Sequence, residues 1–149
     1  DYLAAKRRTL KLVAEHTYAA LSDTGALLTP PEGSFYVLPN FATTPRYHRA
    51  ATERRSDGSY MTSEEMTMEI LERTGVACLA GSHFGFAPEL LRARMAYVDF
   101  DGAAAMEAAA SVPAEVLGSD PEGEAFVRQY APRVADGLDS LCGFLKTDD

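Results

Sequence analysis

The chain has 149 residues, of which 46% are hydrophobic and 24% charged, and its formal net charge is −8. This length suits one domain with a sizeable core, and the composition is ordinary for a soluble globular protein. No apolar run approaches the ~20 residues of a membrane helix, and the negative charge argues against nucleic acid or anionic lipid as the main partner. We therefore expect a single domain, 1–149, of a soluble protein.

The chain begins with a predicted amphipathic helix. Over residues 1–22, apolar side chains recur at helical spacing with lysines and arginines between them, and Gly25 follows as a stop signal. A short extended piece, 26–29, precedes the turn signal Pro-Pro-Glu-Gly at 30–33. The β-prone run at 34–38 then predicts a strand.

The middle of the chain combines an irregular segment with strong helix signals. Residues 42–60 are polar and show no consistent period, which predicts an exposed excursion. Thr62 precedes Glu65 by three positions, the pattern of a capping box, so a helix is expected to begin here and to end at Gly75. Glu64 and Glu65 should form its solvated first turn. Residues 76–80 then predict a buried strand.

A tight loop flanked by glycines, 81–85, and a second strand, 93–98, follow. Because side chains alternate along a strand, Arg92 and Arg94 should share one face of it. We expect Ala96 and Val98 on this face as well, and Ala93, Met95 and Tyr97 on the other.

The last third of the chain is predicted to be helical. Asp99 or Asp101 can cap an alanine-rich helix at 102–111, and a short helix is expected at 124–130. A final helix from Pro132 has an apolar stripe of Val134, Leu138, Leu141 and Leu145. Helices with one apolar face must bury it against the strands. The expected fold is therefore a two-layer α+β sandwich with a small, mainly antiparallel sheet covered by helices.

Several familiar kinds of site have little support. The three histidines are scattered without a metal-binding spacing, so we expect no metal centre. Ser82-His83 lacks the strand-to-helix elbow of a nucleophilic serine, and the glycines match neither a dinucleotide fingerprint nor a P-loop. Cys78 and Cys142 lie in apolar settings, which indicates free core thiols in a reducing, cytoplasmic compartment.

The strand arginines are the strongest candidates for function. A planar guanidinium on a strand beside a Gly-x-x-x-Gly loop can donate two parallel hydrogen bonds to a carboxylate or phosphate. The alternative is a surface arginine paired with one of the chain's many acidic residues, an arrangement of minor energetic weight.

Several segments resemble, in order and spacing, the C-terminal small domain of class I/II, fold-type-I pyridoxal-phosphate-dependent aminotransferases. They are Pro-Glu-Gly-Ser-Phe-Tyr at 31–36, the helix at 62–75, Val-Ala-Cys-Leu-Ala-Gly-Ser-His-Phe-Gly at 76–85 and Arg-Met-Ala-Tyr-Val at 94–98. The tail Tyr-Val-Asp-Phe-Asp-Gly-Ala at 97–103 is similar to a bacterial-type subgroup. Two departures from the family pattern are Ala80, where a proline is usual, and a linker at 86–91 without glycine.

This resemblance implies a role for Arg94 in binding the α-carboxylate of an amino acid or 2-oxo acid substrate. Arg92 is the rival for the same role, and we expect it to meet solvent or an acidic side chain instead. The resemblance also implies a set of pocket-lining residues: Phe35, Tyr36, Ser82, His83 and Phe84.

The family's Schiff-base lysine and cofactor-binding residues would lie in a large domain N-terminal to this segment. None of Lys6, Lys11 and Lys146 stands in the family's lysine motif. The resemblance therefore implies a small domain of a longer, homodimeric parent that binds pyridoxal phosphate, and a segment that is inactive alone. A non-catalytic amino-acid-binding or interaction module is the alternative, and a decarboxylase, lyase or regulator domain on the same scaffold is also open.

Overall fold

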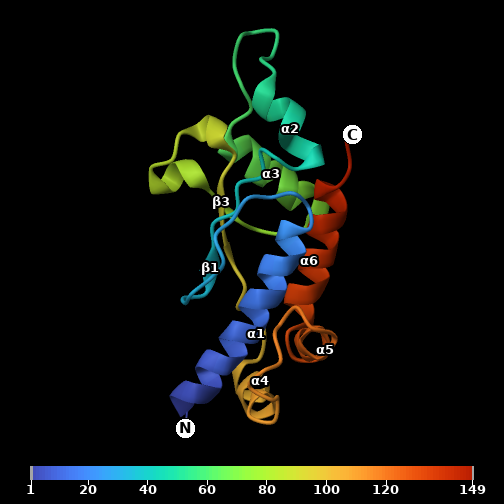
Figure 1. Cartoon of the computed structure of the whole chain (residues 1–149). Coiled ribbons are helices and arrows are strands. Elements are labelled where there is room, and N and C mark those ends of the chain that lie inside the picture. Colours follow the sequence, from blue (N-terminus) through green and yellow to red (C-terminus); the bar gives the residue numbers. More distant parts are fainter. Residues whose placement is uncertain (1, 149) are drawn as a thin grey trace.

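Helices and a small sheet build a mixed α+β fold in the computed structural model, which describes residues 2–148 (Figure 1). The helices are α1 (Tyr2–Ser22), α2 (Pro45–Thr52), α3 (Ser63–Thr74), α4 (Gly102–Ala109), α5 (Pro121–Tyr130) and α6 (Pro132–Leu145). The strands are β1 (Tyr36–Val37), β2 (Leu79–Ala80) and β3 (Ala93–Ala96), and two 3-10 turns are η1 (Gly81–Phe84) and η2 (Pro88–Leu90).

Helices α1 and α6 lie side by side along the length of the molecule and cover one face of the sheet (Figure 1). The buried stripe of α1 includes Leu12, Val13 and Leu21, and α6 buries Leu138, Leu141 and Leu145. The stripe predicted for the last helix is thus confirmed, with Val134 partly buried at its edge. Burying side chains of this size contributes roughly 1.5–3 kcal/mol each, so these helices provide much of the core.

The sheet is antiparallel, with strand order β1-β3-β2. Along β3, Ala93 and Met95 are buried against the helices, whereas Arg94 is half-buried and Ala96 is exposed. The predicted alternation of faces is therefore correct. The prediction that helices cover the sheet holds for one face only, because the outer face carries half-exposed and exposed side chains.

The strands are shorter than predicted. The ladder of β2 and β3 is limited to the pairs Leu79–Arg94 and Ala80–Ala93, and that of β1 and β3 to Tyr36–Ala96 and Val37–Met95. The strand expected at 34–38 has only two residues, those of β1. The buried strand expected at 76–80 also has only two residues, those of β2, and within 76–80 only Ala80 is buried. Residues 75–78 diverge from β3, where Val76 donates its N–H to the Thr74 hydroxyl instead of to a strand.

The exposed excursion predicted at 42–60 is wrong for its first half. This half contains α2, whose N1 position is Pro45 and whose Tyr47 is 1% exposed. The Tyr47 hydroxyl donates to Glu69 of α3 at 3.1 Å, and its ring packs edge-on against Phe144 of α6. Residues 53–59 are exposed, so the prediction is right there.

The helix ends follow the local signals closely. Thr62 and Glu65 form the predicted capping box of α3, and Gly75 ends the helix in the left-handed region with φ +75°. Asp101 accepts hydrogen bonds at the start of α4. Helix α5 begins earlier than predicted, because Pro121 occupies its first turn. We find no helix within residues 2–148 that is both long and apolar enough to cross a membrane.

Candidate functional site

The Arg94 guanidinium lies between two aromatic rings on the outer face of the sheet. Its central carbon is 4.3 Å from the ring centroid of Tyr36 and 4.3 Å from that of Phe84. Each contact is a cation–π interaction, and such contacts contribute roughly 0.5–2 kcal/mol depending on exposure. Both rings lie against the guanidinium, and no acidic side chain within residues 2–148 forms an ion pair with it, so its N–H groups are available to a ligand.

Strand pairing places the first ring. Tyr36 of β1 is opposite Ala96 of β3, so its side chain is on the same face as Ala96 and diagonal to Arg94. The ring of Phe35 lies 4.2 Å from that of Tyr36, which supports it from the side. The register of a two-residue ladder therefore sets one wall of the site.

A close backbone approach places the second ring. The Gly81 N–H donates to the Arg92 carbonyl at 2.7 Å, and a Cβ at Gly81 would lie 2.8 Å from the Arg92 Cβ. Only glycine allows η1 to approach β3 so closely. The turn then carries Phe84 over Arg94 and ends at Gly85, which is left-handed with φ +85°.

Hydrogen bonds donated to α3 hold the turn in place. The Ser82 hydroxyl donates to the Glu64 carboxylate, and the Ser82 N–H donates to the Ser63 hydroxyl at 3.4 Å. The hydrogen bond from Ser82 lowers the pKa of Glu64 below its usual value. Ser82 is thus an anchor of the loop, and His83 is exposed on its surface. Glu64 belongs to this support, although the sequence indicated only a solvated first turn.

Arg92 occupies a second, separate environment. Its guanidinium carbon lies 4.9 Å from the Phe86 ring centroid, and its Nε is buried with no hydrogen-bond partner among residues 2–148. A cavity of about 510 Å³ adjoins it, lined mainly by apolar residues of the 27–31 segment and β1. Of the two surroundings expected for Arg92, solvent or an acidic side chain, an acidic partner is not found within residues 2–148, and the residue is partly exposed.

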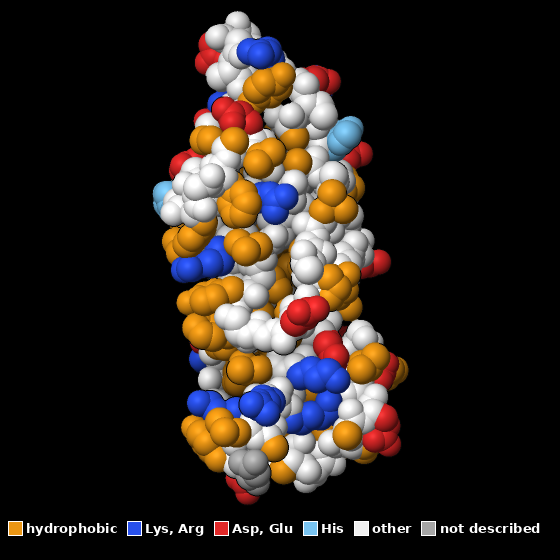
Figure 2. Space-filling view, turned by 60° about the vertical axis from the view of Figure 1, so that its left-hand side comes forward, with side chains coloured by type: hydrophobic (Ala, Val, Ile, Leu, Met, Phe, Trp, Pro, Cys, Tyr) orange, Lys and Arg blue, Asp and Glu red, His pale blue; other side chains and the backbone are white. Residues whose placement is uncertain are grey.

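Neither guanidinium has a carboxylate partner within residues 2–148. Five other arginines do pair with acidic side chains there, namely Arg46, Arg49, Arg55, Arg128 and Arg133. Figure 2 shows this side of the molecule, where basic side chains lie among hydrophobic ones and most acidic side chains lie toward the edges. An arginine left unpaired on a partly apolar surface is suited to an anionic ligand, above all one with a planar carboxylate.

The structure brings together some of the predicted lining residues and not others. Tyr36 and Phe84 contact Arg94, Phe35 supports Tyr36, and Ser82 fixes the loop, whereas His83 is at the periphery. Sequence reasoning missed Phe86 as the neighbour of Arg92. The alternation of Phe84 and Phe86 in the loop was the available signal, because both rings pair with the alternating arginines of the next strand.

The lysines do not fit a cofactor-holding role. Lys11 pairs with Glu15, and Lys6 lies over the Tyr2 ring, both on α1. Lys146 donates to Asp23, and this hydrogen bond raises its pKa, the opposite of what an amine needs to attack a carbonyl. The described residues also contain no group of His, Cys, Asp or Glu arranged for a metal.

Comparisons with known proteins do not identify a function for these residues. No family model matches the chain, and neither the curated proteins nor the solved structures include a match.

Proposed function

We propose that this chain is the carboxylate-binding small domain of a pyridoxal-phosphate-dependent aminotransferase. The observation that carries the proposal is the Arg94 guanidinium, held between Tyr36 and Phe84 with no carboxylate partner among the described residues. The order and spacing of the motifs around it support the same reading. The intact protein would move an amino group between an amino acid and a 2-oxo acid.

Arg94 would bind the α-carboxylate of the substrate through two parallel N–H···O bonds. The stacked rings restrict rotation of the guanidinium, so less entropy is lost when the substrate binds. They also exclude water from both faces, which strengthens the charge-assisted hydrogen bonds. A fixed carboxylate in turn fixes the direction of the substrate's Cα–H bond, which is the orientation that amino transfer requires.

Pyridoxal phosphate would supply the electron sink for this chemistry when bound. The described residues do not fit it, since their lysines are paired or lie away from Arg94 on α1 and at the end of α6. The cofactor would be bound by a large domain elsewhere in a longer, homodimeric protein. This segment alone would contribute substrate binding and no chemical step.

The test is to express the complete gene product that contains this chain and to measure kcat/KM with a panel of amino donors. Arg94→Ala should lower kcat/KM by at least about tenfold, because charge-assisted hydrogen bonds are worth roughly 1.5–3 kcal/mol. Arg94→Lys should also be poor, since a point-charge ammonium cannot reproduce the planar fork.

Arg92→Ala is the matched control, because this arginine is on the same strand face but next to a different ring. Its kcat/KM should fall by less than about fivefold, because in this proposal Arg92 makes no contact with the substrate carboxylate. If Arg92→Ala removes activity while Arg94→Ala retains it, the carboxylate is bound at Arg92.

A non-catalytic amino-acid-binding module is the second candidate. It is favoured by the absence of a fitting lysine within residues 2–148. The complete gene product separates the two: a stoichiometric visible absorbance with pyridoxal phosphate supports the enzyme, and its absence supports the binding module.

A further inference from the structure

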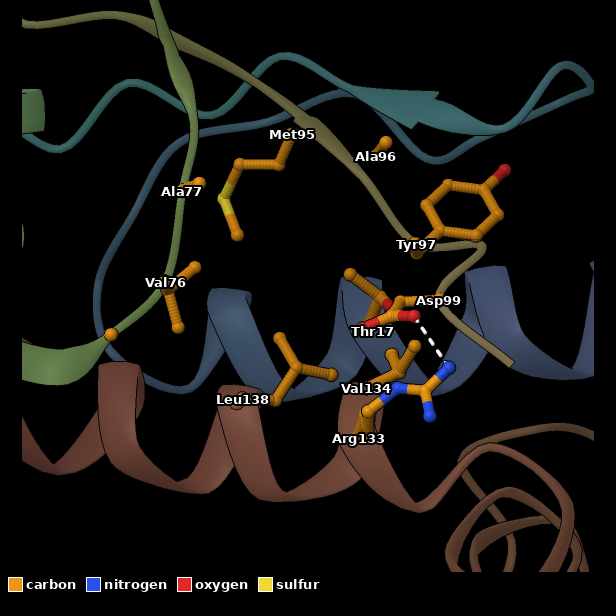
Figure 3. Close-up of a pocket in the computed structure, with 12 residues that line it drawn as sticks. Thr17, Val76, Ala77, Met95, Ala96, Tyr97, Asp99, Arg133, Val134 and Leu138 are labelled. Carbon is orange, nitrogen blue, oxygen red and sulfur yellow. Dashed lines mark hydrogen bonds and ion pairs between the residues drawn. The ribbon is translucent and has the colours of Figure 1, made fainter. Parts of the chain in front are cut away.

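A second cavity lies on the opposite face of β3 from Arg94. It has a volume of about 350 Å³ and opens between β3, α1, α6 and the segment that precedes β2 (Figure 3). Met95, the residue that follows Arg94, lines this cavity from the inner face of the sheet. The two sites therefore share a strand but not a surface.

The cavity exists because two chain segments separate. The β2–β3 ladder ends at the pair Leu79–Arg94, so Val76 and Ala77 diverge from Met95 and Ala96 (Figure 3). Gly137 of α6 keeps the space open. A Cβ at this glycine would approach the nearest Val76 methyl at 3.5 Å, an ordinary contact, so a side chain there would fill the cavity without backbone strain.

The interior of the cavity is mainly apolar. Val76, Met95, Val134 and Leu138 point toward it (Figure 3). The one hydroxyl on the α1 side, that of Thr17, already donates to the Val13 carbonyl at 2.8 Å. The interior therefore suits an aliphatic or aromatic group of modest size.

Two opposite charges lie together at one end of the cavity. Arg133 Nη2 donates to Asp99 Oδ1 at 2.7 Å, from separate elements of the chain (Figure 3). The side chains are 68% and 70% exposed, respectively. An ion pair that exposed contributes little to stability, so a ligand can replace it at small cost.

We propose that this cavity binds a small zwitterion with an apolar side chain, which is the chemistry of a free apolar amino acid. The apolar side chain enters between Val76, Met95 and Leu138. The ligand's carboxylate pairs with Arg133 and its ammonium pairs with Asp99, so each exposed charge exchanges one partner for another. A cation or an anion alone would satisfy one of these charges and leave the other without its partner. This binding site does not depend on the function proposed for Arg94.

The test is a titration of the isotopically labelled 149-residue chain with L-leucine, followed by NMR. Met95 methyl and Gly137 amide resonances should shift in a saturable manner. The isosteres 4-methylpentanoate and 3-methylbutylamine lack the ammonium and the carboxylate, respectively. Each should bind more weakly, by up to about fivefold, because it loses one contact with an exposed charge.

Variants locate the binding site. Gly137→Leu should abolish the shifts by filling the cavity, and Arg133→Gln should weaken binding by up to about fivefold without requiring any repacking. Arg128→Gln is a control outside the cavity and should leave the affinity unchanged. Leucine titrations that leave the Met95 and Gly137 resonances unmoved would overturn the proposal. Equal affinity for the two isosteres and for leucine would contradict the proposal that the ligand is a zwitterion.

Discussion

Arg94 is a positive charge without an acidic partner among the described residues of an acidic protein. The chain has 22 Asp and Glu against 14 Lys and Arg, yet no carboxylate pairs with this guanidinium within residues 2–148. Its guanidinium carbon instead lies 4.3 Å from the centroids of two aromatic rings, those of Tyr36 and Phe84. The aromatic contacts thus stabilise the side chain while leaving its hydrogen-bonding edge unused.

Replacing Phe84 tests this stacking in the chain itself. Protons above an aromatic face are shielded, so Phe84→Ala should shift the Arg94 Nε–H proton downfield in the NMR spectrum. Phe86→Ala is the matched control, since Phe86 stacks on Arg92 and should shift the Arg92 proton instead. An unchanged Arg94 resonance in Phe84→Ala would contradict the sandwich geometry.

His16 gives a second prediction at this scale. Its side chain is 9% exposed on α1 and faces Glu124, Arg128 and Asp139 of α5 and α6. Burial lowers its pKa below the ordinary 6.5, with Arg128 adding to this effect and the two carboxylates opposing it. The folded state thus favours neutral imidazole. The stabilisation is complete above the unfolded-state pKa and is lost as the pH falls through the folded-state pKa.

We expect His16→Gln to reduce the decline in unfolding free energy between about pH 7.5 and about pH 5. Urea unfolding of the variant and the parent chain at both pH values measures it. His48→Gln, on the exposed surface of α2, should leave the decline unchanged. A decline of equal size in His16→Gln would show that other groups cause it.

At the scale of elements, two glycines with opposite surroundings make a matched pair. A Cβ at Gly81 would lie 2.9 Å from the Arg92 carbonyl oxygen, whereas one at Gly143 of α6 would meet nothing within 4 Å. Gly81→Ala should destabilise the fold by about 1–3 kcal/mol through backbone displacement. Gly143→Ala should stabilise it by about 0.5–1 kcal/mol, because alanine loses less entropy in a helix.

Urea unfolding of both variants checks the prediction. A neutral Gly81→Ala would mean that η1 can move away from β3 without cost, and Phe84 should then lose its contact with Arg94.

Elements with local signals at both ends could be predicted from the sequence. Helix α3 begins with a capping box and ends at a left-handed glycine, so both limits were correct. Helix α2 was missed because Tyr47 is its single buried residue, which produces no period. Strand lengths were overestimated because pairing depends on the path of the partner segment, as where residues 75–78 diverge from β3.

The alternation along β3 correctly placed both arginines on one face. Their aromatic contacts depend on tertiary pairing, for which the alternation of Phe84 and Phe86 was the local signal.

At the scale of the whole molecule, the two faces of the sheet have different roles. The inner face joins the core formed with α1 and α6, and the outer face carries Arg92 and Arg94 with their rings. A rigid helical layer behind the outer face would keep the binding residues that we propose there in place. Both cysteines pack against the core, and burial raises the pKa of Cys78 to about 11.

Local stability should vary along the chain, and residues 53–59 should have a low free energy of local opening. These residues are exposed, whereas α2 directly before them is tied to the core by Tyr47. Amide exchange should therefore be faster across 53–59 than at the hydrogen-bonded amides of α2. Tyr47→Phe, which removes the hydrogen bond to Glu69, should accelerate exchange in α2 and destabilise the chain by about 1 kcal/mol. Exchange as fast in α2 as in 53–59, already in the unmodified chain, would show that Tyr47 does not anchor this helix.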